Sequence, residues 1–194
     1  MSSNFPQEGK LDPRIKRTRS LLGQALTDVL AEKGFQAVSV QDITEKAGVN
    51  RTTFYLHFPD KYALLEYNIS QLFHQELDKR MLSICHYTPE NLTSLIVTVA
   101  EFIQFSNLHC APEPQFEALV ELQVKKQVQA VIEAWGQKTE FGAVPKLIGI
   151  ATSWAIYGLA LEWSRDKNHP GAGTFALGIT PIINSILGVQ QPAW

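Results

Sequence analysis

Cysteine is scarce in this sequence, which contains only Cys85 and Cys110 in 194 residues. Two cysteines are too few for a disulfide framework, and such low use is typical of proteins from a reducing compartment. Each stands beside a histidine, as Cys85-His86 and His109-Cys110. Adjacent residues point apart on a helix or strand, however, and no further ligand follows at a metal-binding spacing. We therefore expect two part-buried thiols and no metal site.

Long hydrophobic runs are also missing. The longest uncharged stretches are residues 147–161 and 168–194. The first is shorter than the roughly 20 residues that a membrane-spanning helix needs. The second is interrupted by prolines and glycines, and the polar N-terminal arm, residues 1–12, lacks the apolar core of a secretory signal. We expect a soluble, cytoplasmic protein that does not associate with membranes.

The sequence has few strand patterns and no recognisable enzyme signature. Apolar residues recur at spacings of three and four almost throughout, which predicts an all-α protein. There is no glycine-rich phosphate loop and no Ser/His/Asp or Cys/His arrangement with a known local signature. Histidines such as His74 and His169 are scattered and unpaired with acids. These absences predict a protein that is not an enzyme and that needs no cofactor.

Positive charge is sparse overall, since the formal net charge is −2, which argues against a general nucleic-acid binder. Its distribution is uneven. Residues 10–61 hold nine Lys/Arg and six Asp/Glu, a balance of +3, whereas residues 82–194 hold six and nine, a balance of −3. A mildly positive first third on a mildly negative body fits a DNA-reading head attached to a body that avoids DNA.

Three helix boundaries near the N-terminus can be assigned from capping signals. A helix over 13–33 is followed by Gly34, which we expect to end it. Ser39 stands three residues before Asp42, the spacing of a capping box that opens a second helix. Gly48 is expected to stop that helix, because a tight reversal there needs a positive φ that glycine adopts freely.

A third helix over 51–58 follows within a few residues. Asn50 is placed to cap it, Phe54 and Phe58 face inward at i and i+4, and Asp60 opens a fourth helix. Two short helices joined by a glycine turn, with a supporting helix ahead, define a helix-turn-helix. Any small helical bundle shows such caps, but the outward face of this helix carries almost no acid, which suits a helix lying beside phosphates.

Residues 41–65, QDITEKAGVNRTTFYLHFPDKYALL, closely resemble the signature of the tetracycline-repressor (TetR) family of bacterial regulators. The matching positions are Gly48-Val49, Thr53-Phe54-Tyr55, His57-Phe58, Lys61 and Ala63-Leu64-Leu65. The resemblance covers roughly residues 15–65, about a quarter of the chain. Two positions depart from the pattern: Thr44 stands where alanine is usual, and Thr52 where glycine is frequent.

The resemblance implies an all-α fold with an N-terminal three-helix DNA-binding domain, residues 13–60, and a larger helical ligand-binding and dimerisation domain, residues 61–194. The fourth helix, from about residue 60, links the two. It also implies that a symmetric dimer inserts the third helix of each copy into the major groove of a near-palindromic operator. In such families a small effector favours a conformation that releases the DNA.

Side-chain chemistry divides the candidate contacts into readers and anchors. Arg51 can offer a bidentate fork to guanine, Thr52 and Leu56 can touch a thymine methyl, and Gln41 suits a base or a phosphate. The others suit phosphate anchoring, which fixes register without reading sequence. The full set of expected DNA contacts is Lys16, Arg17, Thr18, Ser39, Gln41, Asn50, Arg51, Thr52, Thr53, Tyr55, Leu56, His57 and Lys61.

Other interpretations of individual contacts stay open. Tyr55 can be half core with only its hydroxyl exposed, and His57 can cap the end of its helix, where a cation is favoured. Lys16 and Arg17 can be solvated charges, or they can clamp the backbone beside the operator or reach a minor groove. Each of these alternatives leaves the helix-turn-helix itself unchanged.

The last fifty residues hold only five charged side chains. Helices that apolar do not suit a monomer's surface, although both could be buried inside one body. We expect helices 145–165 and 174–187 to form a four-helix interface in a homodimer. Aromatic residues of the body are candidates to line a pocket for a small apolar or aromatic effector, although at helical spacing they also suit packing. These candidates are Phe102, Phe105, Phe116, Trp135, Trp154 and Tyr157.

The sequence leaves the direction of regulation open. We expect a repressor released by a small molecule. The alternative is an activator or co-regulator whose C-terminal body docks a protein partner instead of a small ligand. The operator sequence and the effector cannot be identified from the residues.

Overall fold

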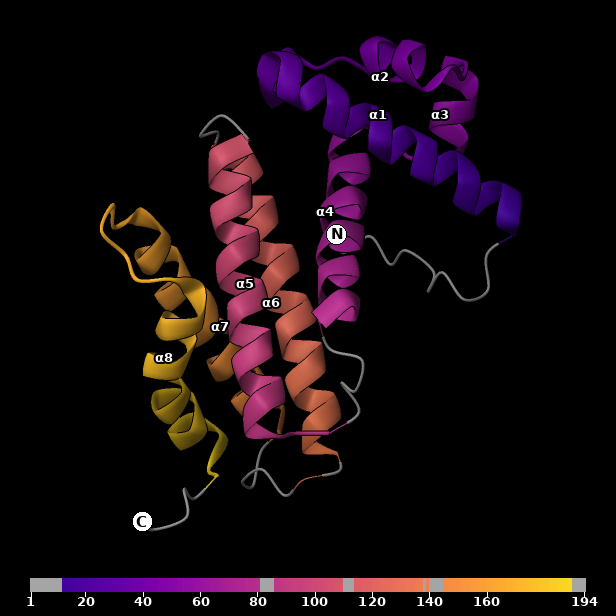
Figure 1. Cartoon of the computed structure of the whole chain (residues 1–194). Coiled ribbons are helices and arrows are strands. Elements are labelled where there is room, and N and C mark those ends of the chain that lie inside the picture. Colours follow the sequence, from indigo (N-terminus) through magenta and orange to yellow (C-terminus); the bar gives the residue numbers. More distant parts are fainter. Residues whose placement is uncertain (1–11, 81–85, 110–113, 138, 140–144, 190–194) are drawn as a thin grey trace. The chain divides into compact units, whose positions relative to one another are not determined.

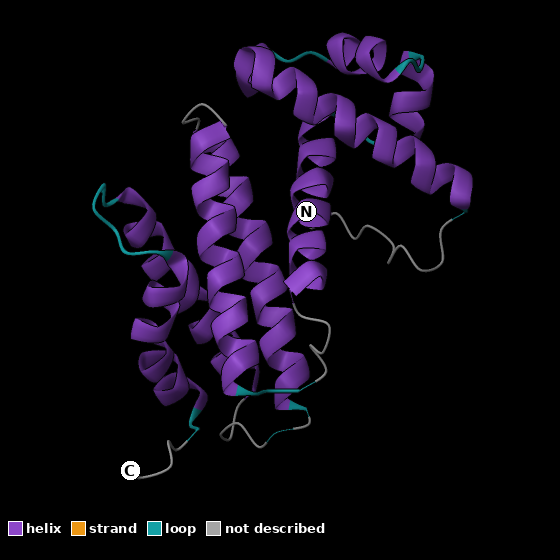
Figure 2. Ribbon diagram, viewed as in Figure 1, coloured by secondary structure: helices purple, strands orange, loops and turns teal. Residues whose placement is uncertain are grey.

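A computed structural model describes residues 12–80, 86–109, 114–137, 139 and 145–189, and within these residues it contains α-helices and no strand (Figures 1 and 2). The helices are α1 Pro13–Ala37, α2 Val40–Ala47, α3 Arg51–His57, α4 Lys61–Arg80, α5 Pro89–His109, α6 Pro114–Gly136, α7 Pro145–Arg165 and α8 Ala172–Leu187. The predicted all-α fold is confirmed. Cys85 and Cys110 lie outside the described residues.

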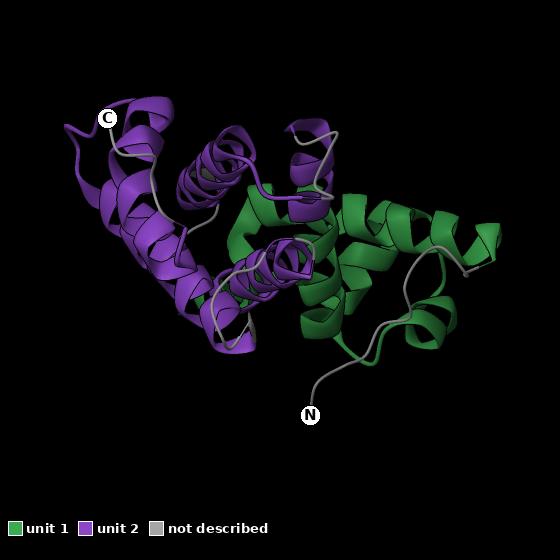
Figure 3. Ribbon diagram, turned by 90° about the horizontal axis from the view of Figure 1, so that it is seen from below, with its two compact units in different colours: residues 1–71, 108–119 green, residues 72–107, 120–194 purple. Residues whose placement is uncertain are grey.

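The chain divides into two compact units, coloured separately in Figure 3. Unit 1 comprises Met1–Gln71 and Leu108–Leu119, and unit 2 comprises Leu72–Asn107 and Val120–Trp194. Helix α4 therefore contributes its first half to unit 1 and its second half to unit 2. The predicted domain boundary near residue 60 stays a prediction. The compact units are a different kind of division, because unit 1 combines two segments that are distant in sequence.

Helix α1 begins at a proline, whose fixed φ suits the first helical turn. Asp12 caps it, since its Oδ1 accepts a hydrogen bond from the Arg14 amide at 2.8 Å. Gly34 interrupts the helix with φ 72° and ψ 159°, a conformation essentially restricted to glycine. The expected stop at Gly34 is thus present as a break in the backbone, although a short helical segment resumes after it and ends at Ala37.

The core of unit 1 is formed where α1 packs on α2 and α3. Leu22, Leu26, Ile43, Phe54 and Leu64 are completely buried. α1 also approaches α4 closely, because a Cβ added to Gly23 would lie only 2.7 Å from Oδ1 of Asn68. The Asn68 side-chain amide donates a hydrogen bond to Thr27 Oγ1 at 3.0 Å, so a polar contact accompanies this close approach.

Unit 2 is held together by buried apolar side chains on α5, α6, α7 and α8. Completely buried examples from each are Leu95, Trp135, Ile156 and Ile183. The segment before α5 is tied to α8, because the Tyr87 hydroxyl donates a hydrogen bond to Asn184 Oδ1 at 2.9 Å. α7 packs against α8 within this unit.

The last two helices agree closely with the expected ranges, since α7 spans Pro145–Arg165 as expected. α8 begins two residues earlier than expected and continues through Pro181. α6 is a single helix with no break. Of the helices described, none is both long and apolar enough to cross a membrane.

Candidate nucleic-acid interface

The turn between α2 and α3 has the geometry that its glycine predicts. Gly48 adopts φ 66° and ψ 32°, the left-handed region that ends a helix. The amides of Gly48 and Val49 donate to the carbonyls of Glu45 and Thr44 at 3.2 and 3.0 Å, which satisfies the last turn of α2. The reversal is therefore complete within three residues, Gly48 to Asn50, and the helix-turn-helix is confirmed.

Asn50 caps α3 as the sequence predicts. Its Oδ1 accepts hydrogen bonds from the amide of Thr53 at 2.7 Å and from the Thr53 hydroxyl at 3.0 Å. Both side chains are thus engaged in shaping the first turn of α3. Their predicted DNA contacts stay predictions. A phosphate bound at either side chain would have to coexist with the hydrogen bonds that cap α3.

The outward face of α3 is the face that the sequence predicts. Phe54 and Phe58 are buried, whereas Arg51 and Thr52 are exposed. Leu56 is 79% exposed, which is unusual for a large apolar side chain and leaves it free to meet a thymine methyl. No acidic side chain stands on α3, so the exposed surface offers donors and an apolar group to a groove.

Tyr55 and His57 each belong partly to the core. Tyr55 is 50% exposed, and its ring packs edge-on against Phe54 at a centroid distance of 5.3 Å. Burial, and to a smaller extent the nearby charge of Arg19, lowers the pKa of the His57 imidazole below its usual value. A neutral imidazole is therefore favoured at the end of α3. That weakens the alternative of a charged helix cap but leaves one N–H to donate to a phosphate.

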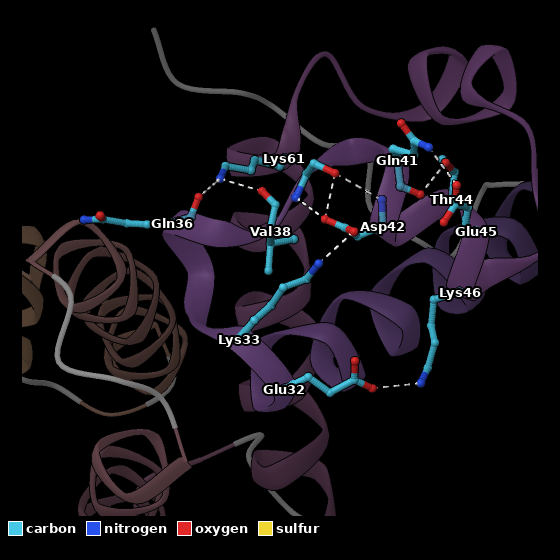
Figure 4. A network of polar contacts seen from close by, with 11 residues as sticks. Glu32, Lys33, Gln36, Val38, Gln41, Asp42, Thr44, Glu45, Lys46 and Lys61 are labelled. Carbon is cyan, nitrogen blue, oxygen red and sulfur yellow. Dashed lines mark hydrogen bonds and ion pairs between the residues drawn. The ribbon is translucent and has the colours of Figure 1, made fainter.

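A capping box opens α2, as predicted from Ser39 and Asp42. The Asp42 amide donates to Ser39 Oγ at 3.2 Å, while the Ser39 amide donates to Asp42 Oδ2 at 2.8 Å. The structure adds a partner that the sequence did not indicate, since Lys33 lies 2.7 Å from Asp42 Oδ1 (Figure 4). The first turn of α2 is thereby joined to the end of α1.

Gln41 is exposed on α2, but a neighbour on the same helix orients its amide. Its Nε2 donates to Glu45 Oε1 at 2.8 Å, as Figure 4 shows. One of the two N–H groups of Nε2 is occupied in this arrangement, so the second N–H and the amide oxygen are left to face a base or a phosphate. The role of Gln41 as a base or phosphate contact stays a prediction.

Lys61 forms hydrogen bonds within unit 1, and its predicted role as a phosphate anchor stays a prediction. Its Nζ is 2.9, 3.3 and 2.7 Å from the carbonyl oxygens of Phe35, Gln36 and Val38. A phosphate at this ammonium would compete with all three hydrogen bonds. This long-range cluster was not detectable from the sequence, because Lys61 is more than twenty residues away from its partners.

The N-terminal turns of α1 hold the remaining candidate contacts. Arg17 is exposed, Lys16 is half-buried, and the Thr18 hydroxyl donates to the Arg14 carbonyl at 3.0 Å. Sequence reasoning missed Arg19, which is buried with its guanidinium over the rings of Phe58 and Tyr67, 5.5 Å from each centroid. Its position in the apolar stripe of α1, between Ile15 and Leu22, was the available signal.

The aromatic candidates for an effector pocket fall into two groups. Phe102, Trp135 and Tyr157 of unit 2 are buried, as is Phe116 of unit 1, whereas Phe105 and Trp154 of unit 2 are exposed. Several take part in packing: Phe102 contacts Phe73 at 5.0 Å, and Lys125 lies over the Trp154 ring. The pocket therefore stays a prediction.

Comparison with known proteins identifies the first part of the chain. Residues 24–67 match the family model of bacterial regulatory proteins of the tetR family. Two HTH-type transcriptional regulators of Bacillus subtilis (strain 168), YxbF and YvdT, are 43% identical over 61 residues and 41% identical over 56 residues. These regions are 31% and 29% of this chain, but only 16% and 29% of the two relatives. The chain thus spans less than a third of the length of these curated relatives.

Solved structures resemble the chain over nearly its whole length. A TetR-family regulator from Streptomyces coelicolor A3 aligns with a TM-score of 0.61 and 16% identity, covering 96% of this chain and 99% of that one. RolR, solved with the ligand resorcinol, aligns with a TM-score of 0.57 and 15% identity, covering 93% and 97%. At these identities the likeness shows the fold. The matched family and relatives are regulators, which agrees with the expectation that this chain is not an enzyme.

Proposed function

Because the chain belongs to the TetR family of transcriptional regulators and carries its DNA-binding helix-turn-helix, we propose that it is a repressor that binds a near-palindromic operator as a dimer. A small molecule bound in its helical body releases it from DNA. Its place of action is the compartment that holds the DNA, the cytoplasm.

The observation that carries this proposal is the outward face of α3. The helix is fixed by its cap at Asn50 and by the buried rings of Phe54 and Phe58, so its remaining side chains point outward. That face combines a guanidinium, hydroxyls and an exposed leucine, with no carboxylate on the helix. A rigid helix with this surface meets the needs of major-groove readout.

Within that face we assign reading to Arg51, Thr52 and Leu56, helped by Gln41 on α2. Arginine is suited to the O6 and N7 acceptors of guanine, and the apolar groups to the thymine methyl. The proposed backbone anchors are Ser39, Thr53, Tyr55 and His57, with Lys16, Arg17 and Thr18 at the start of α1 and Asn50 at the turn. These contacts orient the head and supply affinity that salt weakens.

The proposed dimer uses the exposed faces of α7 and α8. Leu147 and Trp154 on α7 are 61% and 60% exposed, and Leu177 and Ile182 on α8 are 67% and 53% exposed. α8 carries no Lys, Arg, Asp or Glu along its sixteen residues. An uncharged helix with exposed leucine and isoleucine is poorly suited to water and well suited to a second copy.

The proposed effector is a small apolar or aromatic molecule. Support comes from the aromatic residues of the body and from RolR, which has this fold and was solved with resorcinol. The alternative is a protein partner that docks on the body. A thermal-shift screen separates the two, because a ligand that stabilises the chain and weakens its DNA binding supports the small-molecule effector.

The experiment that tests the central proposal is selection of bound sequences from random double-stranded DNA, repeated at two salt concentrations. Enrichment of a palindromic motif is expected, and the spacing of its half-sites reports on the dimer. Retention of enrichment at the higher salt distinguishes base reading from general phosphate attraction. Absence of any enriched motif would refute sequence-specific binding.

A further inference from the structure

The ammonium group of Lys61 is the centre of a contact that joins α4 to the end of α1 and to Val38, which lies between α1 and α2. Lys61 is the first residue of α4, yet its Nζ reaches back to the last turn of α1 and to Val38 just after it (Figure 4). There it lies 2.9 Å from the Phe35 carbonyl, 3.3 Å from that of Gln36 and 2.7 Å from that of Val38. An ammonium carries three hydrogens, so the three acceptors match its donors in number.

The break at Gly34 explains why these carbonyls need a donor. Carbonyls in the last turn of a helix have no amide partner ahead of them and must be satisfied in another way. Here the helix is interrupted by Gly34 and ends at Ala37, after which Val38 is extended. The Val38 amide bonds the Phe35 carbonyl at 3.2 Å, and the Lys61 ammonium adds a second donor to that carbonyl. The ammonium also bonds the carbonyls of Gln36 and Val38, so it holds the end of α1 and the residue that follows it.

The placement of Lys61 on α4 supports the same conclusion. A positive charge in the first turn of a helix opposes the helix dipole and is unfavourable there. The nearby acceptors and the rings of Phe35 and Tyr62, at 4.6 and 5.7 Å from Nζ, provide the opposing stabilisation. The position of Lys61 is therefore accounted for by its contacts with residues 35–38 and not by any stabilisation of α4 itself.

The loop held by Lys61 leads directly into the predicted DNA-contacting residues. Val38 precedes Ser39, the N-cap of α2, and Gln41 stands on the first turn of that helix. Ser39 is in turn bonded to Asp42. Displacement of the Val38 carbonyl would therefore shift the start of α2, and α3 would move with it, because α3 is joined to α2 by a three-residue turn.

We propose that Lys61 is a positioning residue that fixes the start of α2, and through it the α2–α3 pair, in the orientation that reads DNA. This inference rests on the proposed DNA-binding function. It departs from the sequence-based expectation that Lys61 anchors a phosphate. The two roles differ in a measurable way, because a residue that neutralises a phosphate contributes to the salt dependence of binding and a positioning residue does not.

The test uses the full chain and the operator obtained by selection, with the variants Lys61→Met, Lys61→Arg and Lys46→Met. Lys61→Met keeps the length of the side chain and removes the ammonium. Lys46→Met is the matched control, because Lys46 is an exposed lysine of the same unit with one ion pair, to Glu32 at 3.1 Å. Affinities for operator and for random DNA are measured at several salt concentrations, at a temperature at which circular dichroism shows each variant folded.

For Lys61→Met we expect operator affinity to fall about tenfold or more, the size associated with losing hydrogen bonds from a charged group. Affinity for random DNA and the slope of log K against log salt should match those of Lys46→Met. Lys61→Arg keeps the charge but places its donors differently, so it should also lose operator affinity. It provides a second, charge-preserving measurement should the methionine variant unfold.

Three results would overturn the inference. A salt slope shallower by about 0.9, with operator and random DNA weakened alike, would identify a phosphate contact. Unchanged operator affinity together with a lowered melting temperature would make Lys61 a purely structural residue. Failure of the unmodified chain to prefer operator over random DNA would refute the proposed function itself, and is seen before any variant is compared.

Discussion

Lys33 Nζ lies 2.7 Å from Asp42 Oδ1, an ion pair that links the end of the long first part of α1 to the first turn of α2. The other carboxylate oxygen of Asp42 accepts hydrogen bonds from the amide and hydroxyl of Ser39 at 2.8 and 2.7 Å. The hydrogen bond with Lys33, and after it those with Ser39, holds the pKa of the Asp42 carboxyl well below its usual range. The start of α2 therefore depends on a charged carboxylate.

This relationship predicts an acid-sensitive helix-turn-helix. A carboxyl whose pKa is lower in the folded than in the unfolded state stabilises the fold above its unfolded pKa, about 4 for aspartate. That stabilisation is lost progressively as the pH falls below that value toward the lower pKa of the folded state. Asp42→Asn should therefore lower stability at pH 7 and flatten its decline between pH 5 and pH 2.5, both conditions to be measured by urea unfolding.

The matched control for that measurement is Asp28→Asn. Asp28 is an aspartate of α1 whose carboxylate accepts a hydrogen bond from Gln24 Nε2 at 2.9 Å. Within the residues that the structure describes, it forms no ion pair with a lysine. Its replacement should leave the pH dependence close to that of the unmodified chain. Equal pH profiles for Asp42→Asn and the unmodified chain would show that the capping box adds no proton-linked stability.

Two glycines of unit 1 have positive φ but should respond differently to asparagine. Gly48, at φ 66° and ψ 32°, lies in the left-handed region that asparagine tolerates, and a Cβ there meets nothing within 4 Å. Gly34, at φ 72° and ψ 159°, lies in a region that side chains essentially do not enter. Gly34→Asn should cost about 1–3 kcal/mol of unfolding free energy, and Gly48→Asn clearly less.

Denaturant unfolding of the two variants checks this order. A larger loss at Gly48 than at Gly34 would contradict the backbone argument.

These comparisons show which parts of the molecule could be predicted from sequence. The caps at Ser39 and Asn50 and the reversal at Gly48 depend on residues within three positions of one another, so their spacing alone indicates them. The outward face of α3 followed from Phe54 and Phe58 at helical spacing. Predictions of this kind use only local geometry, and they were confirmed.

Contacts between distant segments could not be predicted in the same way. Lys61 bonds carbonyls more than twenty positions away. Every residue has a backbone carbonyl, so no residue type in the sequence indicates which carbonyls accept such a bond. No role was predicted for Arg19, because buried arginine is rare, although Arg19 occupies a position in the apolar stripe of α1. In both cases the side chain's partner is set by how helices pack.

Arg51 is the residue to which we assign the strongest base contact. Arg51→Ala should weaken operator binding by about 1–3 kcal/mol and relax the preference at one base pair. Affinities for the operator and for its single-base variants measure both effects. Lys126→Ala, at an exposed site in unit 2, controls for the loss of one positive charge. Equal weakening on every sequence would reassign Arg51 to the DNA backbone.

The exposed apolar face of α8 predicts the oligomeric state. Leu177 and Ile182 are 67% and 53% exposed, and no charged residue is present on the helix. If α8 packs against a second copy, a carboxylate at either position would be buried in an apolar contact, at a cost of several kcal/mol. Leu177→Glu and Ile182→Glu should therefore shift a dimer toward monomer in sedimentation at micromolar concentration, while helical content stays unchanged.

Loss of the dimer should also weaken DNA binding without any change in the reading head. Two linked heads engage two half-sites jointly, so a monomer binds the operator far more weakly than a dimer while its binding to one half-site is unaltered. Leu122→Glu is the matched control, because Leu122 is 54% exposed but lies on α6. The interface would lie elsewhere if that control dissociated the dimer and the α8 variants did not, and a monomeric unmodified chain would refute the dimer itself.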